Sequence, residues 1–272
     1  MALDNAPLGK SSEYPDQYDP TLLFPVARGE NRRRIGLEDG RWPWFGGDLW
    51  QAWEVSWLKP GGMPVVAWAE ICFPAASPAI IESKSLKLYL NSLNQAVFSS
   101  GEQVAETIIR DLSSACGASV SVQLHSVDAS APAVGRPDGF ELIDDEPVDA
   151  VVYDYAPESL LADGPVVTEG LCSHLLKSNC PVTGQPDWAT VFIRYTGRKL
   201  NRAGVLRYLV SFRQKQDFHE HCVETIFTDL MARCQPESLT VCARYTRRGG
   251  LDINPWRSTD SEEGPGPRLV RQ

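Results

Sequence analysis

An internal repeat constrains the fold of this chain more than any other feature of its sequence. Residues 106–116 and 224–234 share six of eleven positions at an offset of 118. Upstream, residues 88–95 match 207–214 at an offset of 119, and residues 119–122 match a segment downstream at the same offset. Three matches in the same order are typical of a duplicated unit rather than of chance. The sequence therefore predicts two copies of one module.

Each copy has the same expected order of elements. Strand-like runs come first, then two helical patterns, then at least one further strand. The strand-like runs are Trp50–Leu58 and Pro64–Phe73 in the first copy, and Leu171–Leu176 and Trp188–Gly197 in the second. Strands that pair as hairpins, with helices grouped between them, predict an α+β fold of antiparallel sheets with helices packed on one face.

The helical patterns carry capping signals and two distinct faces. Ser99-x-x-Glu102 and Asp217-x-x-Glu220 have the spacing of capping boxes, so each is expected to open the second helix of its copy. In the first helix of the first copy, one face is apolar and another is polar. The apolar stripe is Leu86, Leu90, Leu93 and Val97, and the polar face carries Lys84, Lys87, Asn91 and Asn94.

The repeat and the composition between its copies predict four segments. These are an N-terminal extension at 1–48, a first module at 49–140, an acidic linker at 141–165 and a second module at 166–272. The linker is rich in Pro, Gly and acidic residues and is expected at the surface. The last dozen residues have the composition of a tail that orders only on contact.

Charge and composition exclude several classes of function. The 26 basic and 35 acidic residues give a net charge of −9, with no general attraction for nucleic acid or anionic membranes. No apolar run approaches the roughly 20 residues of a membrane helix, and no signal-peptide pattern is present. Seven scattered cysteines are an odd number and fit reduced thiols, so we expect a cytoplasmic protein.

A thiol and a carboxylate flank a loop in the second copy. Cys180 precedes, and Asp187 follows, the Pro- and Gly-containing residues 181–186. A rigid loop can fold these two groups back on one another, as a nucleophile and its proton donor require. His219 and Glu220 add two further titratable groups. The set predicts an enzyme site built around a cysteine, although a single Cys is more often structural and a single Asp more often ends a turn.

These motifs resemble a known enzyme family, the NADPH-dependent 7-cyano-7-deazaguanine reductases, in their long, two-module form. The resemblance runs from Asp19 to Gln272, and its most specific parts are Glu82–Tyr89, Cys180–Asp187, Phe218–Glu220 and Arg244–Asp252. It implies two tandem tunnelling-fold (T-fold) modules and the reduction of a nitrile to a primary amine, with two NADPH consumed, in queuosine biosynthesis. The implied substrate is a small molecule, without direct contact to nucleic acid, and a homodimer is expected.

The resemblance also implies a role for each candidate residue. Cys180 would attack the nitrile carbon to give a covalent thioimidate, with Asp187 and His219 delivering protons. The residues implied to bind the substrate are Ile81, Glu82, Ser83, His219 and Glu220. Those implied to bind NADPH are Ser83, Lys84, Arg248 and Gly249, with Lys87 as a further candidate. Without the resemblance, the lysines are a solvated helix face, Glu220 is a cap, and no Gly-x-Gly-x-x-Gly supports a Rossmann fold.

Two other functions stay open at this point. The spacing Cys172-x-His174-x₅-Cys180 resembles a metal-ligand pattern, with His221 as a further ligand. Relatives of the implied fold include zinc-dependent GTP cyclohydrolases, so a zinc-dependent purine or pterin hydrolase is the alternative. A non-catalytic purine-binding protein would leave the Cys–Asp–His set unexplained. The nitrile-reductase interpretation implies no metal.

Overall fold

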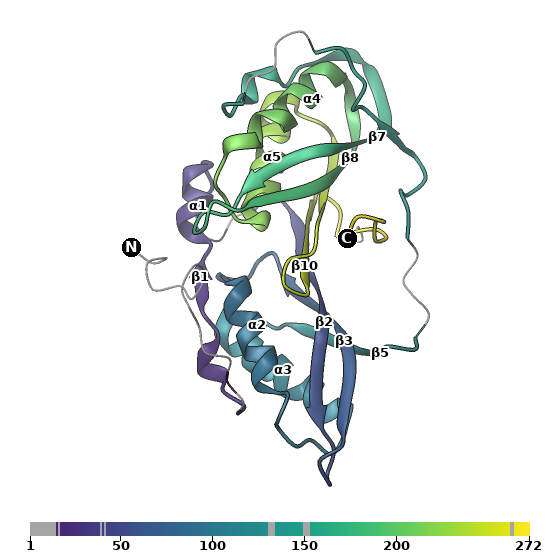
Figure 1. Ribbon diagram of the computed structural model, residues 1–272. Helices are drawn as coiled ribbons and strands as arrows, with labels where there is room; N and C mark the ends of the chain where they lie inside the picture. The colour runs from purple at the N-terminus through teal and green to yellow at the C-terminus, as the bar shows by residue number, and fades with distance from the viewer. Residues whose placement is uncertain are drawn as a thin grey trace. The chain divides into compact units, whose positions relative to one another are not determined.

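The chain forms two compact units, each assembled from segments that are far apart in the sequence (Figure 1). The computed structural model describes residues 15, 17–38, 40, 42–129, 134–148, 153–261 and 264–272. Unit 1 comprises the described residues of 1–30, 47–131 and 247–253, and unit 2 comprises those of 31–46, 132–246 and 254–272. The division into four segments at residues 48, 140 and 165 stays a prediction.

Unit 1 contains an antiparallel sheet and two main helices. The strands β2 (Phe45–Leu58), β3 (Pro64–Pro74) and β5 (Ser121–Ser126) lie in the order β5-β3-β2, followed by the start of β10 (Leu251–Ser258). The helices are α2 (Ser83–Ser92) and α3 (Gly101–Cys116). A short 3-10 turn, η2 (Pro20–Leu22), and a separate strand pair, β1 (Pro25–Ala27) with β4 (Ala79–Ile81), complete the unit.

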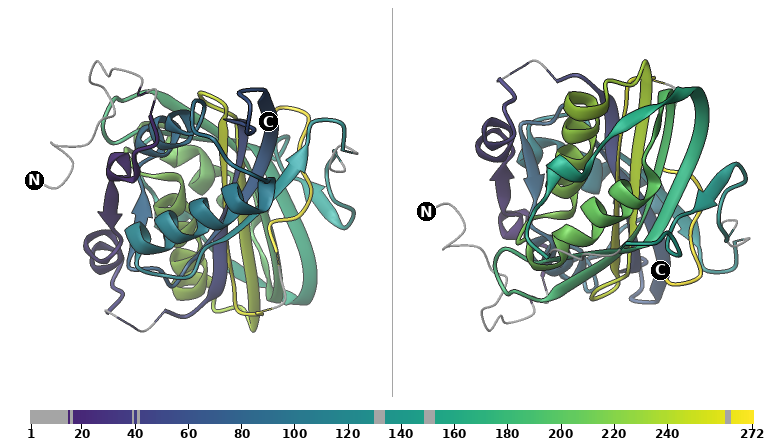
Figure 2. Two further views of the ribbon diagram at one scale, coloured as in Figure 1. Left: turned by 90° about the horizontal axis from the view of Figure 1, so that it is seen from below. Right: turned by 90° about the horizontal axis from the view of Figure 1, so that it is seen from above.

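Unit 2 repeats this arrangement. The strands β6 (Phe140–Leu142), β7 (Ala162–Asn179), β8 (Pro186–Leu200) and β9 (Ser238–Tyr245) lie in the order β9-β8-β7-β6, and the end of β10 pairs with β9. The helices are α1 (Gly29–Arg34), α4 (Arg202–Ser211) and α5 (His219–Cys234), with 3-10 turns η3 (Pro157–Ser159) and η4 (Phe212–Gln214). All these strand pairs are antiparallel except β6 with β7. Helices α4 and α5 lie on one face of this sheet (Figure 2).

The two units share details beyond the order of their elements. The helices α2 and α4 have equal lengths, as do α3 and α5. In unit 1 the Asp111 carboxylate accepts hydrogen bonds from the hydroxyls of Tyr18, at 2.5 Å, and Tyr89, at 2.7 Å. In unit 2 Asp229 accepts in the same way from Tyr155, at 2.6 Å, and from Tyr208. The α+β class with mostly antiparallel sheets, predicted from the sequence, is confirmed.

The helix starts differ by one residue from the predicted capping boxes. Ser100, not Ser99, caps α3, and its hydroxyl accepts from the Gln103 N–H at 3.3 Å. Two adjacent serines offer the same group, so the local sequence does not choose between them. Helix α5 starts after Phe218, whose side chain makes no capping hydrogen bond. His219 therefore begins that helix.

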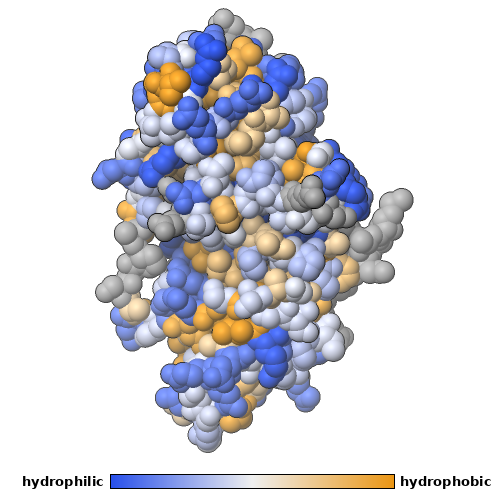
Figure 3. Space-filling view, turned by 180° about the vertical axis from the view of Figure 1, so that it is seen from behind, coloured by the Kyte–Doolittle hydropathy of each residue, from blue (hydrophilic) through white to orange (hydrophobic). Residues whose placement is uncertain are grey.

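The apolar core of unit 1 lies between its sheet and its helices. Leu86, Leu90 and Leu93 are buried there as predicted. Val97 is 60% exposed instead, because α2 ends at Ser92 and the helical stripe stops with it. The face in Figure 3 is mostly hydrophilic, with apolar patches among the polar residues.

The sequence did not decide whether the residues after Ser258 fold, and the structure packs the end of the chain against unit 2. Leu269 is buried in a cluster with Cys172, Phe192 and Cys242. The Gln272 side chain donates to the Tyr245 carbonyl oxygen at 3.0 Å. Residues 264–272 are therefore held by contacts with unit 2.

Candidate functional site

A tight hairpin between β7 and β8 positions the predicted nucleophile. Cys180 directly follows β7, its N–H donates to the Gln185 carbonyl oxygen at 2.8 Å, and its own carbonyl oxygen accepts from Gly184 at 2.9 Å. Gly184 has a φ of +69°, which a residue without Cβ adopts at low cost. Asp187 is the second residue of β8, opposite Ser178 of β7. The thiol and the carboxylate are thus held by one hairpin, and both residues are buried.

The first turn of α5 brings an imidazole to this hairpin. His219 Nε2 lies 3.3 Å from Asp187 Oδ2, and both side chains are more than nine-tenths buried. Glu220 follows on the same turn and is 2% exposed. The structure therefore brings together Asp187 and His219, which are 32 residues apart in the sequence, beside the hairpin that carries Cys180.

Backbone hydrogen bonds tie the hairpin to the start of α5. The Asn179 N–H donates to the Lys215 carbonyl oxygen at 2.8 Å, and the Asp217 N–H donates to the Asn179 carbonyl oxygen at 3.0 Å. Cys180 is one residue from this link and His219 is two residues beyond Asp217. A short parallel bridge thus fixes the spacing of the two functional segments.

Sequence reasoning missed an aromatic residue next to His219. Tyr245, at the end of β9, stacks on the imidazole with 3.8 Å between ring centroids and 6° between ring planes. Burial raises the pKa of Tyr245 well above its ordinary value. Burial also raises the pKa of Cys222, which lies about one turn beyond His219 in α5, to about 12. Both groups therefore stay protonated and uncharged near neutral pH, and only their tertiary contacts reveal this.

The predicted substrate-binding residues at Ile81–Ser83 lie in unit 1, at the start of α2. The Glu82 carboxylate caps this helix, accepting from the N–H groups of Lys84 at 2.7 Å and Ser85 at 2.9 Å. Glu82 is 1% exposed, and this burial raises the pKa of its carboxyl group. Each carboxylate oxygen has two lone pairs, so capping leaves Glu82 able to accept further hydrogen bonds. The sequence did not reveal its capping role.

The predicted cofactor residues Arg248 and Gly249 belong to a hairpin turn whose two central residues are Gly249 and Gly250, and Lys87 of α2 contacts this turn. Arg248 and Leu251 exchange backbone hydrogen bonds of 2.9 and 3.0 Å around this turn. Gly249 and Gly250 have φ values of +57° and +81°, as type I′ turns require. Lys87 of α2 donates to the Gly249 carbonyl oxygen at 2.7 Å. The turn and α2 therefore carry all four predicted cofactor residues, since Ser83 and Lys84 open that helix.

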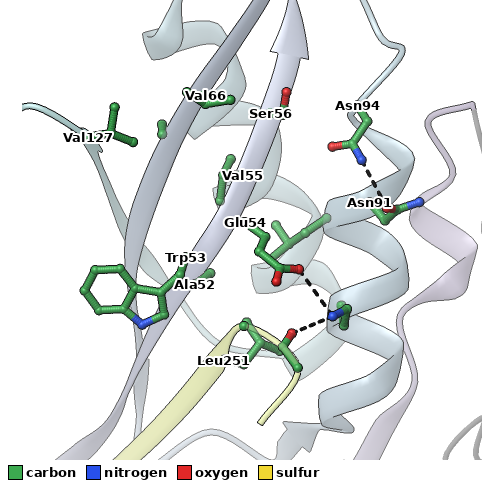
Figure 4. Close-up of a pocket in the computed structure, with 15 residues that line it drawn as sticks. Ala52, Trp53, Glu54, Val55, Ser56, Val66, Asn91, Asn94, Val127 and Leu251 are labelled. Carbon is green, nitrogen blue, oxygen red and sulfur yellow. Dashed lines mark hydrogen bonds and ion pairs between the residues drawn. The ribbon is translucent and has the colours of Figure 1, made fainter. Parts of the chain in front are cut away.

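Lys87 makes an ion pair in addition to its hydrogen bond to Gly249. Its ammonium group lies 3.2 Å from the Glu54 carboxylate of β2. In Figure 4 a dashed line that starts at Glu54 marks this ion pair. A Cβ on Gly250 would lie 2.6 Å from the carboxylate carbon of Glu54, so a larger residue at this point of the turn would require the Glu54 side chain to move. The sequence offered Lys87 as a phosphate contact, and the structure shows that it also supports the turn.

Three residues of the alternative zinc site make other contacts in the structure. Cys172 is buried in the apolar cluster of unit 2, and His174 Nδ1 lies 2.9 Å from the Thr190 hydroxyl. His221 Nδ1 lies 3.3 Å from Asp217. Among the described residues, no three His, Cys, Asp or Glu side chains are arranged to hold a metal ion.

A buried thiol and a buried carboxylate on one hairpin, with an imidazole from α5 beside the carboxylate, are the groups of the predicted cysteine-dependent enzyme site. Comparison with known proteins shows an enzyme family. Residues 14–124 match the family model described as nitrile reductase, 7-cyano-7-deazaguanine-reductase N-term, and residues 186–264 match that of QueF-like protein. The chain belongs to the 7-cyano-7-deazaguanine reductase family.

Curated relatives match along nearly the full length. The NADPH-dependent 7-cyano-7-deazaguanine reductase of Chromohalobacter salexigens is 54% identical, over 99% of this chain and 98% of its own. The proteins of the same name from Dechloromonas aromatica and Bordetella avium are 53% and 52% identical, over 98% and 97% of this chain and 95% and 97% of their own. In the part of the chain that the structure describes, no helix is long and apolar enough to span a bilayer.

Proposed function

We propose that this chain reduces the nitrile of 7-cyano-7-deazaguanine to the amine of 7-aminomethyl-7-deazaguanine, in queuosine biosynthesis. Relatives more than 50% identical over almost the whole chain bear the name of this NADPH-dependent reductase. The structural observation that carries the proposal is the hairpin that holds Cys180 and Asp187 beside His219. Two NADPH molecules, bound one after the other, would each supply one of the two hydrides that convert a nitrile to an amine.

The first step is covalent addition at Cys180. Its sulfur bonds to the nitrile carbon, one C–N bond of the triple bond breaks, and the nitrogen takes up a proton to give a thioimidate. Asp187 accepts the thiol proton and returns it to that nitrogen, so the protons balance. Burial of both residues keeps water from the thioimidate and prevents its hydrolysis.

His219 is the second proton carrier in this proposal. Its Nε2 lies 3.3 Å from Asp187 Oδ2, close enough for the two groups to exchange a proton when they form a hydrogen bond during the reaction. After the first hydride has added to the thioimidate carbon, the C–S bond breaks, Cys180 leaves as a thiolate, and this thiolate regains a proton from solvent through His219 and Asp187. The imine that remains takes up a second proton during the second reduction, and His219 is the group placed to deliver it.

Substrate recognition is assigned to carboxylates and to the residues beside them. Glu220 offers two acceptor oxygens side by side, which suit the ring N–H and amino group of a guanine-like edge. Ile81, Glu82, Ser83 and His219 complete the proposed substrate-binding set. Both glutamates are at most 2% exposed, so each hydrogen bond to the base forms away from bulk water.

The residues proposed for NADPH fit a phosphate-bearing cofactor. Lys84 and Arg248 supply positive charge, and Ser83 supplies a hydroxyl donor. Gly249 lets the backbone of the turn approach closely, because a Cβ there would already lie 3.3 Å from the Lys87 ammonium. We assign the phosphates of NADPH to Ser83, Lys84, Arg248 and Gly249.

We further infer that the chain is a duplicated pair of T-fold modules. Equal helix lengths and the repeated tyrosine–aspartate hydrogen bonds support the duplication. A cytoplasmic homodimer that acts on a small molecule, with no direct nucleic-acid contact, completes the proposal.

Intact mass spectrometry tests the proposed function directly. Wild-type protein mixed with 7-cyano-7-deazaguanine without NADPH should gain one substrate mass, and a Cys180→Ala variant should gain none. Adding NADPH should remove the adduct and release 7-aminomethyl-7-deazaguanine. A folded wild-type protein that forms no adduct would overturn the covalent mechanism, and assays for bound zinc and for ring hydrolysis would follow.

A further inference from the structure

The side chain of Gln272 is buried, at 9% exposed, and it connects two strands of unit 2. Its Nε2 donates to the Tyr245 carbonyl oxygen at 3.0 Å and to Asn254 Oδ1 at 2.6 Å. Its Oε1 accepts from the Leu269 N–H at 3.0 Å. Since Tyr245 ends β9 and Asn254 belongs to β10, both amide N–H donors of Gln272 are used on the sheet.

The Tyr245 carbonyl oxygen receives from Gln272 a hydrogen bond that a neighbouring strand would otherwise supply. The Thr246 N–H donates to the Trp188 carbonyl oxygen of β8 at 2.9 Å. Backbone groups of successive strand residues point to opposite edges, so the Tyr245 carbonyl oxygen points away from β8, toward the side on which β10 runs. The backbone pairing of β9 with β10 ends three residues before Tyr245. Gln272 therefore takes the place of a strand partner there.

The residues before Gln272 hold its side chain in this position. The Gln272 N–H donates to the Leu269 carbonyl oxygen at 3.1 Å, and Arg268 donates to the Gln272 carbonyl oxygen at 2.7 Å. Leu269 is itself buried in a cluster with Phe192 and Cys242 of the sheet. A turn that is anchored in this way presents the amide without much side-chain freedom left to lose.

The ring of Tyr245 connects this contact with the proposed site. It stacks on the imidazole of His219, with ring centroids 3.8 Å apart. Tyr245 is fully buried, and a carbonyl oxygen left in such a place without a donor is costly. We expect the end of β9 to shift toward another partner when the donor is removed. The closely packed ring then shifts with its backbone, and the plane of the imidazole is no longer fixed.

We propose that Gln272 is a positioning residue for the reduction at Cys180 and acts on His219 through Tyr245. Gln272 holds the Tyr245 carbonyl oxygen, the Tyr245 ring fixes the imidazole, and the imidazole delivers protons. The inference rests on the proposed function and adds to it a residue 27 positions beyond Tyr245.

Single-turnover kinetics of the full-length chain test this role. Gln272→Leu removes both donors at similar size, and it should slow the reduction of the preformed adduct by NADPH about tenfold. Adduct formation depends on Cys180 and Asp187 and should keep its wild-type rate. Val270→Ala, at a residue that is 88% exposed, should match wild type in both steps. No loss in Gln272→Leu, or equal losses in both steps, would overturn the proposal.

A double variant separates positioning from a general effect on structure. If Gln272 acts through the Tyr245 ring, adding Gln272→Leu to Tyr245→Leu should slow the reduction no further than Tyr245→Leu does alone. Losses that multiply in the double variant would mean that the two residues act independently, and would overturn the proposal.

NMR of protein with ¹³C-labelled histidine gives a measurement that does not depend on the reaction. The chain has four histidines, and the ring current of a stacked phenol displaces the His219 signals from their ordinary positions. Gln272→Leu and Gln272→Glu, which both remove the amide donors, should move these signals toward the ordinary positions and leave those of His125 in place. Unmoved His219 signals beside a normal adduct would overturn this inference alone, whereas a wild-type protein that forms no adduct would defeat the proposed function as well.

Discussion

The imidazole of His219 lies flat on the phenol ring of Tyr245, with ring centroids 3.8 Å apart and ring planes 6° from parallel. The stack fixes the plane of the imidazole, while Asp187 lies 3.3 Å from its Nε2 atom. Tyr245 is fully buried, so this contact cannot be replaced by water. Tyr245 thus positions the imidazole that we propose as a proton carrier, and we expect its ring to matter more than its hydroxyl.

Tyr245→Phe should keep the stack and nearly full activity, whereas Tyr245→Leu should remove the flat surface beneath His219. A proton carrier displaced by a fraction of an ångström costs about tenfold to a hundredfold in rate. We expect this loss in the single-turnover reduction of the preformed adduct by NADPH, followed by stopped-flow absorbance.

Adduct formation without NADPH provides the control for that experiment. It depends on Cys180 and Asp187, so it should proceed in Tyr245→Leu at close to the wild-type rate, provided that circular dichroism shows a folded protein. Equal losses in adduct formation and reduction would indicate a general structural defect and contradict the positioning role.

Asp187→Asn should slow the formation of the Cys180 adduct by about 10² to 10⁴-fold, since the amide cannot accept and return the thiol proton. The side chain keeps its size and its place in β8, so the fold should be retained. The rate is measured by quenched-flow mass spectrometry.

Asp163→Asn is the matched control, because Asp163 is an exposed carboxylate in the neighbouring strand β7. It should react like wild type. A wild-type rate in Asp187→Asn would assign the proton transfer to another group.

Glu224→Gln should destabilise the protein by about 3–5 kcal/mol, because Arg32 and Arg257 would be left buried without their counter-charge. The Glu224 carboxylate accepts from Arg32 at 2.6 Å and from Arg257 at 2.7 Å, and all three side chains are at most 1% exposed. Urea unfolding monitored by tryptophan fluorescence measures the change.

The repeat supplies the control for that prediction. Glu106 occupies the equivalent position in the first copy and is exposed. Glu106→Gln should change the free energy of unfolding by no more than about 0.5 kcal/mol. Similar values for the two variants would mean that the buried ion cluster adds nothing to stability.

The titration of the Glu82 carboxyl group should lower the free energy of unfolding as the pH rises. Burial raises the pKa of its folded carboxyl group above the ordinary value of 4.5, so the folded state holds the proton over a pH range in which the unfolded state has lost it. The free energy of unfolding therefore decreases from about pH 4.5 upward, until the pH has passed the raised pKa.

Glu82→Gln removes the titrating group and keeps an acceptor oxygen for the N–H groups of Lys84 and Ser85. The wild type should accordingly lose stability relative to Glu82→Gln as pH rises through that range. Urea unfolding of both proteins from pH 4 to pH 8 measures the difference. A difference that is independent of pH, or that grows in favour of the wild type, would contradict the raised pKa.

Many of the strands, helices and turns were predictable because local sequence patterns indicate them. Periodicity located the main strands and helices, and the two modules that the repeat at offsets of 118 and 119 predicts stay a prediction. The loop after Cys180 indicated a hairpin that would bring Asp187 back toward it, since turn chemistry is set by neighbouring residues. The family resemblance then named the reaction.

Other features depend on groups that meet only when the chain has folded. Glu82 has the residue type of a ligand contact, yet its backbone geometry makes it the cap of α2. Arg32 reaches Glu224 across 192 positions, and Tyr245 reaches His219 from a different strand. Local sequence carries no signal for such pairs, because the two partners meet only after the sheet and helices have packed. The sequence by itself thus determined the helices, the strands and the types of reactive side chain in this protein. Tertiary packing decided which other side chains surround those reactive groups.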